Sequence, residues 1–157
     1  MKYIMLNPKL FIEQINTSQI LSGLDFGDKT IGIAISDKTY TIATPIKTLK
    51  RKGIKQDISE LTKLFKEYNI GGVVFGLPLS LNGQENERTK KVRIFANEMK
   101  KVTKMNITFF DERFSSDIVF KEFRKGGFSI SKINKKINHL AASYILQGFL
   151  DTSKNMI

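Results

Sequence analysis

Two kinds of hydrophobic periodicity follow one another along this chain, and their order limits the folds open to it. Short apolar or alternating segments, which are typical of strands, occupy residues 21–26, 30–36, 40–49, 71–77 and 106–111. Segments with a helical stripe of apolar residues occupy residues 56–68, 86–103, 115–124 and 138–151. The first three strands are consecutive, whereas the last two alternate with helices. We therefore expect an α/β fold in which helices flank a mixed sheet, with an antiparallel meander first and parallel strands after it.

The connections between these segments agree with this order. Gly27-Asp28-Lys29 separates the first two strands and predicts a hairpin turn. Pro45 lies in the third strand, which indicates a sheet edge or a bulge because proline cannot donate to the ladder. Residues 127–136 are basic and predict a loop before the last helix.

The length of 157 residues suits one domain with a sizeable core. We place it at 21–151, between an N-terminal extension at 1–20 and a C-terminal tail at 152–157. The chain has no cysteine and one histidine, His139, which excludes thiolate ligands and a multi-histidine zinc site within one chain. We find no signal peptide and no window near the ~20 apolar residues of a membrane span. These features predict a cytoplasmic protein with no membrane partner.

The net charge of +11 would attract polyanions, of which nucleic acid is the commonest. Basic residues gather in three runs, at 47–55, 88–93 and 121–136. Two of these runs flank the acidic residues considered next, which favours a surface that binds a phosphate backbone. General lysine enrichment in an AT-rich genome would produce the same net charge, so the charge alone leaves both interpretations open.

Asp25 stands near the end of the first apolar strand and precedes a glycine-containing turn. A carboxylate at the edge of a core has to be paired, hydrogen-bonded or bound to a metal. Gly27 permits a sharp turn and lets a phosphate approach the backbone, and Lys29 can supply positive charge. An ordinary hairpin also uses aspartate and glycine, so the spacing by itself does not decide between a site and a turn.

A second acidic group, Asp111-Glu112, ends the strand at 106–111 and is followed by Arg113. Ligands commonly bind at the carboxyl ends of strands in α/β sheets, although a surface salt-bridge cluster would use the same residues. Gly76-Leu77-Pro78-Leu79 begins a structured loop that either lines a phosphate path or turns the chain.

Asn138 and His139 open the last predicted helix. Asparagine is a good N-cap, and a lone histidine is more often structural than a ligand, so helix capping is the simpler interpretation of this segment on its own.

Taken in order, these segments resemble the YqgF/RuvX family. Its members are ribonuclease H-like proteins described as Holliday junction resolvases and as nucleases that process the 5′ end of precursor 16S ribosomal RNA. The resemblance covers residues 21–151 and is specific through the joint order of its motifs. The motifs are Leu24-Asp25-Phe26-Gly27 with Lys29, Ile31 and Gly32; Ser36-Asp37; Gly76-Leu77-Pro78-Leu79 with Gly83; Arg93, Phe95 and Ala96; Asp111-Glu112-Arg113; and Ala141-Ala142 with Ile145-Leu146-Gln147.

The resemblance implies a metal-dependent endonuclease that uses Mg²⁺ or Mn²⁺ in a cluster of three carboxylates. The first two catalytic and metal-binding positions map to Asp25 and Glu112, and the third maps to Asn138. An amide oxygen can still bind a hard cation but brings no negative charge. The acidic residues that could compensate are Asp28, Asp111 and Asp117.

The resemblance also implies a structured RNA substrate, the precursor ribosomal RNA, with branched DNA as the alternative. The residues expected to bind its backbone are Lys29, Thr30, Arg113, Lys135 and Lys136. We expect a monomer or weak dimer.

Three other functions remain open: a Holliday junction resolvase, a non-catalytic RNA-binding or ribosome-assembly factor, and a nucleotide-binding protein of the actin/Hsp70 type. Asn138 favours the second of these. The chain length disfavours the third, because those proteins need two such domains.

Overall fold

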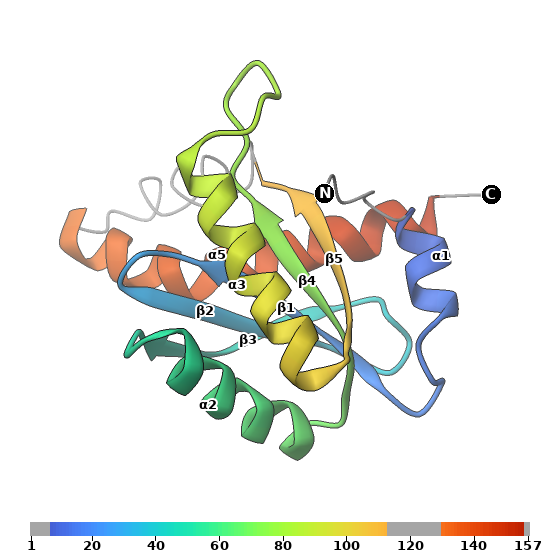
Figure 1. Cartoon of the computed structure of the whole chain (residues 1–157). Coiled ribbons are helices and arrows are strands. Elements are labelled where there is room, and N and C mark those ends of the chain that lie inside the picture. Colours follow the sequence, from blue (N-terminus) through green and yellow to red (C-terminus); the bar gives the residue numbers. More distant parts are fainter. Residues whose placement is uncertain (1–6, 113–129, 156–157) are drawn as a thin grey trace.

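The computed structural model describes residues 7–112 and 130–155, except for the side chains of residues 130–139. Five strands form one mixed sheet in the order β3-β2-β1-β4-β5 (Figure 1). The strands are β1 (Ile20–Phe26), β2 (Thr30–Ser36), β3 (Ala43–Lys50), β4 (Ile70–Leu77) and β5 (Asn106–Asp111). The first three are antiparallel neighbours, and β1, β4 and β5 run parallel. The predicted fold class, with the antiparallel meander first, is therefore confirmed.

The predicted hairpin and the edge strand are both present. The backbone N–H of Gly27 donates to the carbonyl of Thr30 at 2.9 Å, which closes the turn between β1 and β2. β3 is the last strand in the sheet order, and its register against β2 shifts beside Pro45. An edge strand tolerates a residue without an N–H, which explains where the proline lies.

Helices cover both faces of the sheet (Figure 1). α2 (Ile54–Glu67) and α3 (Glu87–Thr103) lie on one face, and α5 (Ile130–Lys154) crosses the other. Alternate residues of β1 divide between the two cores, because side chains of a strand point to opposite faces in turn. Leu24 packs with α2 and α3, whereas Leu21 packs with α5.

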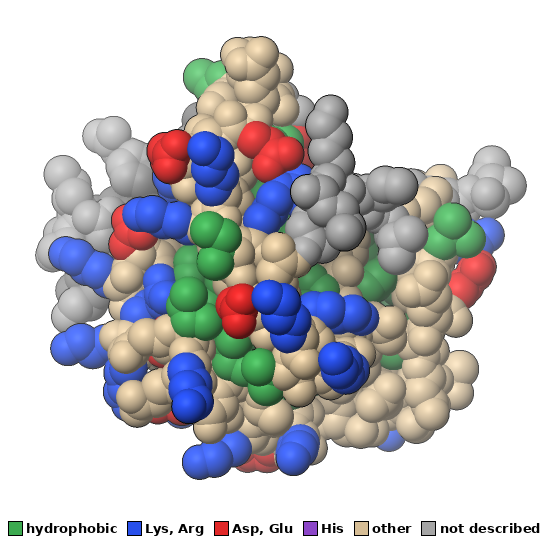
Figure 2. Space-filling view, in the orientation of Figure 1, with side chains coloured by type: hydrophobic (Ala, Val, Ile, Leu, Met, Phe, Trp, Pro, Cys, Tyr) green, Lys and Arg blue, Asp and Glu red, His purple; other side chains and the backbone are tan. Residues whose placement is uncertain are grey.

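The face with α2 and α3 carries many lysines and arginines, spread over the surface rather than gathered in one patch (Figure 2). No helix in the described part of the chain is long and apolar enough to cross a membrane.

α5 approaches β1 closely at Gly23. A Cβ atom on this glycine would lie 2.7 Å from the Cβ of Leu146 and 3.0 Å from the carbonyl oxygen of Ala142. Distances this short are steric clashes, so only glycine allows the helix to lie this near the strand. This close approach fixes where α5 crosses the sheet.

The structure corrects the predicted start of the last helix. Residues 127–136 were expected to form a basic loop, but α5 begins at Ile130 and includes the basic segment from 130 to 136. The apolar residues Ile130, Ile133 and Ile137 are spaced for one helical stripe, which continues into the buried part of the helix. Asn138 is consequently an interior residue of α5 and not its N-cap.

The segment before β1 contains a short helix, α1 (Pro8–Glu13), which was not predicted from the sequence. The side chain of Asn7 caps it by accepting a hydrogen bond from the backbone N–H of Lys9 at 2.9 Å. Phe11 is fully buried and contacts the ring of Phe149 in α5 edge-on, with ring centroids 5.8 Å apart. α1 therefore extends the core that lies between α5 and the sheet.

Candidate active site

The two acidic residues singled out in the sequence lie at the same edge of the sheet. β1, β4 and β5 are parallel, so their carboxyl ends are adjacent, with β4 in the middle. Asp25 is the next-to-last residue of β1, and Glu112 directly follows β5. Asp25 is two residues beyond Gly23, so both lie on the α5 face of β1. The fold thus brings together two residues that are far apart in the sequence.

Gly76 in β4 provides the space for the Glu112 carboxylate. A Cβ atom on Gly76 would lie 2.2 Å from Oε2 of Glu112 and 2.4 Å from Cδ1 of Ile145 in α5. The Glu112 side chain therefore lies across β4, between the sheet and α5. The backbone N–H of Glu112 also donates to the carbonyl of Leu77 at 3.2 Å, which ties the end of β5 to the end of β4.

Both carboxyl groups are held in surroundings that oppose ionisation. Burial raises the pKa of Asp25 to about 6, and the Arg88 guanidinium partly offsets this effect. Burial, together with the charges of Asp25 and Asp111, raises the pKa of Glu112 to about 7 against the opposing effect of Arg88. The influence of Asp25 on Glu112 agrees with their positions on either side of Gly76. Near neutral pH the pair carries less negative charge than two ordinary carboxylates.

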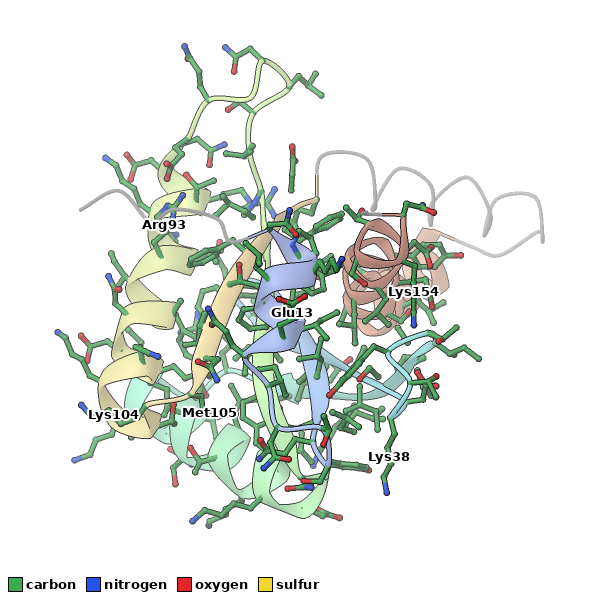
Figure 3. All side chains as sticks on the ribbon, turned by 90° about the vertical axis from the view of Figure 1, so that its right-hand side faces the viewer. Glu13, Lys38, Arg93, Lys104, Met105 and Lys154 are labelled. Atoms are coloured by element: carbon green, nitrogen blue, oxygen red, sulfur yellow. The ribbon has the colours of Figure 1, made fainter. Side chains whose placement is uncertain are left out.

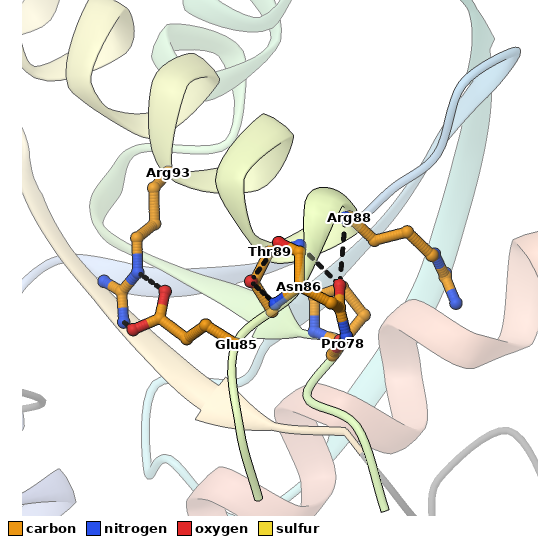
Figure 4. Close-up of polar contacts among 6 residues, drawn as sticks. All are labelled: Pro78, Glu85, Asn86, Arg88, Thr89 and Arg93. Carbon is orange, nitrogen blue, oxygen red and sulfur yellow. Dashed lines mark hydrogen bonds and ion pairs between the residues drawn. The ribbon is translucent and has the colours of Figure 1, made fainter.

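Arg88 was expected only as part of a basic run and was not assigned to the site from the sequence. It lies in the first turn of α3, where its backbone N–H donates to Oδ1 of Asn86 at 2.9 Å. Arg88 lines a small cavity of about 110 Å³ together with Phe26, Gly27, Asp28 and Lys91. Figure 4 shows Arg88 and Arg93 leaving α3 on opposite sides. The sequence signal that identifies Arg88 is its position two residues after a helix N-cap that follows β4.

Asn86 fixes the loop from which α3 begins. Its side chain accepts hydrogen bonds from the backbone of Arg88 and Thr89, and its Nδ2 donates to the carbonyl of Pro78 and to Oγ of Ser80, both at 3.0 Å (Figure 4). The loop extends beyond the carboxyl edge of the sheet (Figure 3). The Gly76-Leu77-Pro78-Leu79 motif therefore makes two contacts that shape the site. Gly76 leaves space for the Glu112 carboxylate, and the carbonyl of Pro78 accepts a hydrogen bond from Asn86, the N-cap of the helix that carries Arg88.

Arg51 stabilises the Gly27 turn. The Arg51 guanidinium donates to the carbonyl of Gly27 at 3.2 Å and lies 4.3 Å from the centroid of the Phe26 ring. Arg51 is itself held by the buried carboxylate of Asp57, at 2.9 Å. Lys29 projects from this turn as an exposed residue, and Thr30 begins β2. Both residues thus lie at the same edge as the carboxylates.

Other predicted site residues fall wholly or partly outside the described residues. Arg113 and Asp117 lie outside the described residues. Asn138, Lys135 and Lys136 are in α5, but their side chains lie outside the described part of the structure. Among the described residues, no three His, Cys, Asp or Glu side chains form a cluster that could hold a metal ion.

Two of the acidic residues considered as substitutes for a third carboxylate are described. Asp28 is 74% exposed in its side chain and pairs with Lys91 at 3.1 Å. Asp111 lies close enough to Glu112 for its charge to raise the Glu112 pKa. Of these two, Asp111 has the clearer electrostatic link to the carboxylate pair.

The chain matches the family model described as RuvX, Holliday junction resolvase, over residues 19–152. It is 40% identical to a protein of Ruegeria pomeroyi named "Putative pre-16S rRNA nuclease", over 87% of this chain and 88% of that protein. A Clostridium novyi protein of the same name is 41% identical, over 83% of this chain and 96% of its own length.

Solved structures share the fold at low sequence identity. Thermus thermophilus RuvC, solved with a Holliday junction substrate, superposes with a TM-score of 0.53 at 9% identity, covering 87% of this chain and 96% of that one. Fowlpox virus resolvase, solved with Holliday junction DNA, gives a TM-score of 0.51 at 15% identity, covering 85% of this chain and 98% of that one. These likenesses support the ribonuclease H-like fold.

Proposed function

The chain belongs to the RuvX family, and from that premise we propose that it is a metal-dependent endonuclease that processes the 5′ end of precursor 16S ribosomal RNA during ribosome biogenesis. The observation that carries the proposal is the pairing of Asp25 and Glu112, two largely buried carboxylates from separate strands, at one edge of the sheet. We place the protein in the cytoplasm, as a monomer or weak dimer.

The chemistry of this pair fits a divalent cation. Two carboxylates that burial and mutual repulsion keep partly protonated are stabilised when a cation replaces the protons. Oxygen ligands are those that Mg²⁺ and Mn²⁺ prefer. We propose that Asp25 and Glu112 hold the ion and that the side-chain oxygen of Asn138 is the third protein ligand. When bound, the ion supplies the Lewis acidity that phosphodiester hydrolysis needs.

The basic residues around the carboxylates are suited to hold the RNA backbone. Lys29 is exposed on the Gly27 turn, and Arg88 faces the small cavity beside that turn. We propose that Lys29, Thr30 and Arg113 contact phosphates near the cleaved bond and that Lys135 and Lys136 contact phosphates farther along the strand. Phosphate contacts of this kind position a nucleic acid without reading its sequence, so structured RNA is the expected class of substrate.

The family description favours one alternative, a resolvase that cuts four-way DNA junctions. Junction cleavage needs two symmetric cuts, which would require a dimer. The amide at position 138 favours another, a factor that binds RNA without cutting it. These alternatives differ in substrate and in the need for a third carboxylate, so one experiment separates them.

The test is a cleavage assay with purified full-length protein and either Mg²⁺ or Mn²⁺, on a precursor 16S RNA leader and on a four-way DNA junction. Asp25→Asn and Asn138→Asp are assayed beside the natural chain. We expect RNA cleavage that Asp25→Asn abolishes. Calorimetric titration with Mn²⁺ should show weaker binding in Asp25→Asn and tighter binding in Asn138→Asp.

Each alternative has its own signature in this assay. Cleavage of the junction but not of the leader would replace the RNA nuclease with a resolvase. Binding of RNA without cleavage by the natural chain, together with cleavage by Asn138→Asp, would make the protein a binding factor on a nuclease fold. Cleavage that survives Asp25→Asn would contradict the proposed site altogether.

A further inference from the structure

A groove of about 880 Å³ runs between α2 and α3, on the face of the sheet away from α5. The active-site carboxylates lie on the α5 face, so this groove is separate from them. The two helices lie side by side on this face of the sheet, and residues of both line the groove. Nothing in the nuclease chemistry requires this surface.

The groove is lined by aliphatic side chains that water can reach. Ile54 is 37% exposed, Ile94 is 54% exposed and Val102 is 66% exposed, and the buried Ile58 lies beneath them. Single exposed aliphatic residues are normal on a protein surface, but several lining one groove indicate an interface with another molecule. In Figure 2 hydrophobic side chains gather on this face, with basic side chains around them.

The dimensions of the groove suit a helix. Its α2 wall runs from Ile54 to Lys66, which corresponds to about 18 Å at the rise of an α-helix. Its α3 wall carries Ile94, Glu98 and Val102, spaced four residues apart and therefore on one side of that helix. An amphipathic helix of three to four turns would lay its apolar stripe along such a channel.

The charge at the groove selects the partner. Lys55, Lys63 and Lys66 line the α2 wall, and none of them has an ion-pair partner among the described residues. Glu98, the acidic residue in the lining, is paired with Lys101 at 3.3 Å. The rim is therefore positive. A second copy of this chain, with its net charge of +11, is a poor match.

We propose that the groove between α2 and α3 docks an amphipathic helix of a partner protein whose apolar stripe is flanked by aspartate and glutamate. The aliphatic residues of the groove bury the stripe, and the three lysines pair with the acidic flanks. RNA is the weaker match, because a phosphate backbone could pair with the lysines but would leave Ile54, Ile94 and Val102 in water. The groove lies on the face opposite α5, so a helix docked there does not occupy the carboxylate site.

The test measures the binding of a fluorescein-labelled helical peptide of about 15 residues to the full chain by anisotropy. The peptide carries leucines at one helical stripe with glutamates on both sides, and a companion peptide has lysine in place of each glutamate. We expect the glutamate peptide to bind and the lysine peptide to bind about tenfold more weakly or worse.

Two kinds of variant locate the binding. Ile94→Asp should weaken binding of the glutamate peptide about tenfold or more, because it places a charge in the apolar channel. Ile42→Asp is the matched control: Ile42 is 59% exposed and lies beside β3, so the affinity should stay within about twofold. Lys63→Glu with Lys66→Glu leaves the apolar residues intact and should reverse the preference to the lysine peptide.

Thermal unfolding of each variant confirms that it is folded before its affinity is interpreted. Failure of the glutamate peptide to bind the natural chain, or equal binding to Ile94→Asp, would overturn the proposal. If a single-stranded RNA oligonucleotide loses affinity in Ile94→Asp while neither peptide binds, the groove is a nucleic-acid surface instead.

Discussion

Burial raises the pKa of both Asp25 and Glu112, and this makes the stability of the metal-free protein depend on pH. The ordinary values are 3.8 and 4.5, whereas the folded values are about 6 and about 7. At pH values between the ordinary and the folded pKa values, the folded state binds more protons than the unfolded state. The free energy of unfolding contributed by these groups is therefore highest below about pH 4 and falls as the pH rises to about 7.

Glu112→Gln should remove the part of this pH dependence that Glu112 contributes, because glutamine is similar in shape and cannot ionise, while Asp25 keeps its own raised pKa. In the metal-free protein at pH 8 we expect the free energy of unfolding to increase by on the order of 2 kcal/mol, with little change at pH 4. Urea unfolding with a chelator present measures both values. Asp28→Asn, which removes an exposed carboxylate, is the control and should produce no such gain. An equal effect of Glu112→Gln at the two pH values would argue against a raised pKa.

Gly76→Ala should disturb both stability and metal binding. The added methyl group would overlap the Glu112 carboxylate and the Ile145 side chain. We expect a loss of ~1–3 kcal/mol in the free energy of unfolding and a weaker affinity for Mn²⁺, since Glu112 has to move. Calorimetric titration and denaturant unfolding measure these two effects.

Gly148→Ala is the matched control for Gly76→Ala. Its methyl group would press on the Phe110 ring at the same helix–sheet interface, without touching the carboxylate. It should lower stability while leaving Mn²⁺ affinity unchanged. Unchanged Mn²⁺ affinity in Gly76→Ala as well would mean that the space beside this glycine does not position Glu112 for the metal.

At the residue scale the sequence predicted the pair but not its surroundings. Asp25 and Glu112 stood out as acidic residues near the ends of apolar strands, but only the family resemblance identified them together as site residues. Arg88 was not recognisable as a site residue. Its effect on the carboxylates depends on where α3 begins, which in turn depends on how Asn86 ties the preceding loop to Pro78.

At the scale of whole elements, hydrophobic spacing predicted the strands and the two helices α2 and α3 to within a few residues. Hydrophobic spacing did not predict the first turns of α5, which are rich in lysine. The segment before Asn138 was interpreted as a loop because it is rich in lysine, but lysine is a good helix former and the isoleucines keep helical spacing. α1 was missed because a six-residue helix is too short to show a period and depends on its packing against α5.

The Asn86 side chain both caps α3 and ties the loop after β4 through Pro78 and Ser80. Different substitutions of Asn86 should separate these two effects. Asn86→Ala removes the cap of α3 and the bonds to Pro78 and Ser80, and we expect a loss of ~1–2 kcal/mol in the free energy of unfolding. Amide hydrogens of the loop should also exchange faster, which mass spectrometry measures.

Asn86→Asp is the informative companion. The carboxylate keeps the acceptor that caps α3 but loses the donor to Pro78 and Ser80. We expect its stability to lie near that of the natural protein while the loop still exchanges faster. Equal exchange in the loop of Asn86→Asp and the natural chain would show that the donor bonds do not order it.

At the scale of the molecule, the sequence predicted a mixed sheet but left the order of its strands open. Periodicity identifies a strand and not its neighbours; the placement of β1 between β2 and β4 follows from burying β1, β4 and β5 beneath helices on both faces. That order leaves one strand, β4, between the two carboxylates of the proposed site. The net charge of +11 is likewise a property of the whole molecule.

Lys135→Ala with Lys136→Ala should weaken RNA binding for all sequences and flatten its salt dependence. The slope of log affinity against log salt should fall by about one for each phosphate that the variant no longer neutralises. Filter binding of the precursor leader over a range of salt concentrations measures the slope. Lys38→Ala with Lys104→Ala is the control of equal charge, because Lys38 and Lys104 lie away from the carboxyl edge (Figure 3). The same slope in both double variants would remove the start of α5 from the RNA-binding surface.

The carboxylate pair lies beneath α5, an element that follows both β1 and β5 along the chain. Until α5 docks on the sheet, Ile145 is missing from the space beside Gly76, and the Glu112 carboxylate lacks its cover on that side. We therefore expect a partly folded chain in which α5 has not docked to hold both carboxyl groups at pKa values nearer the ordinary ones.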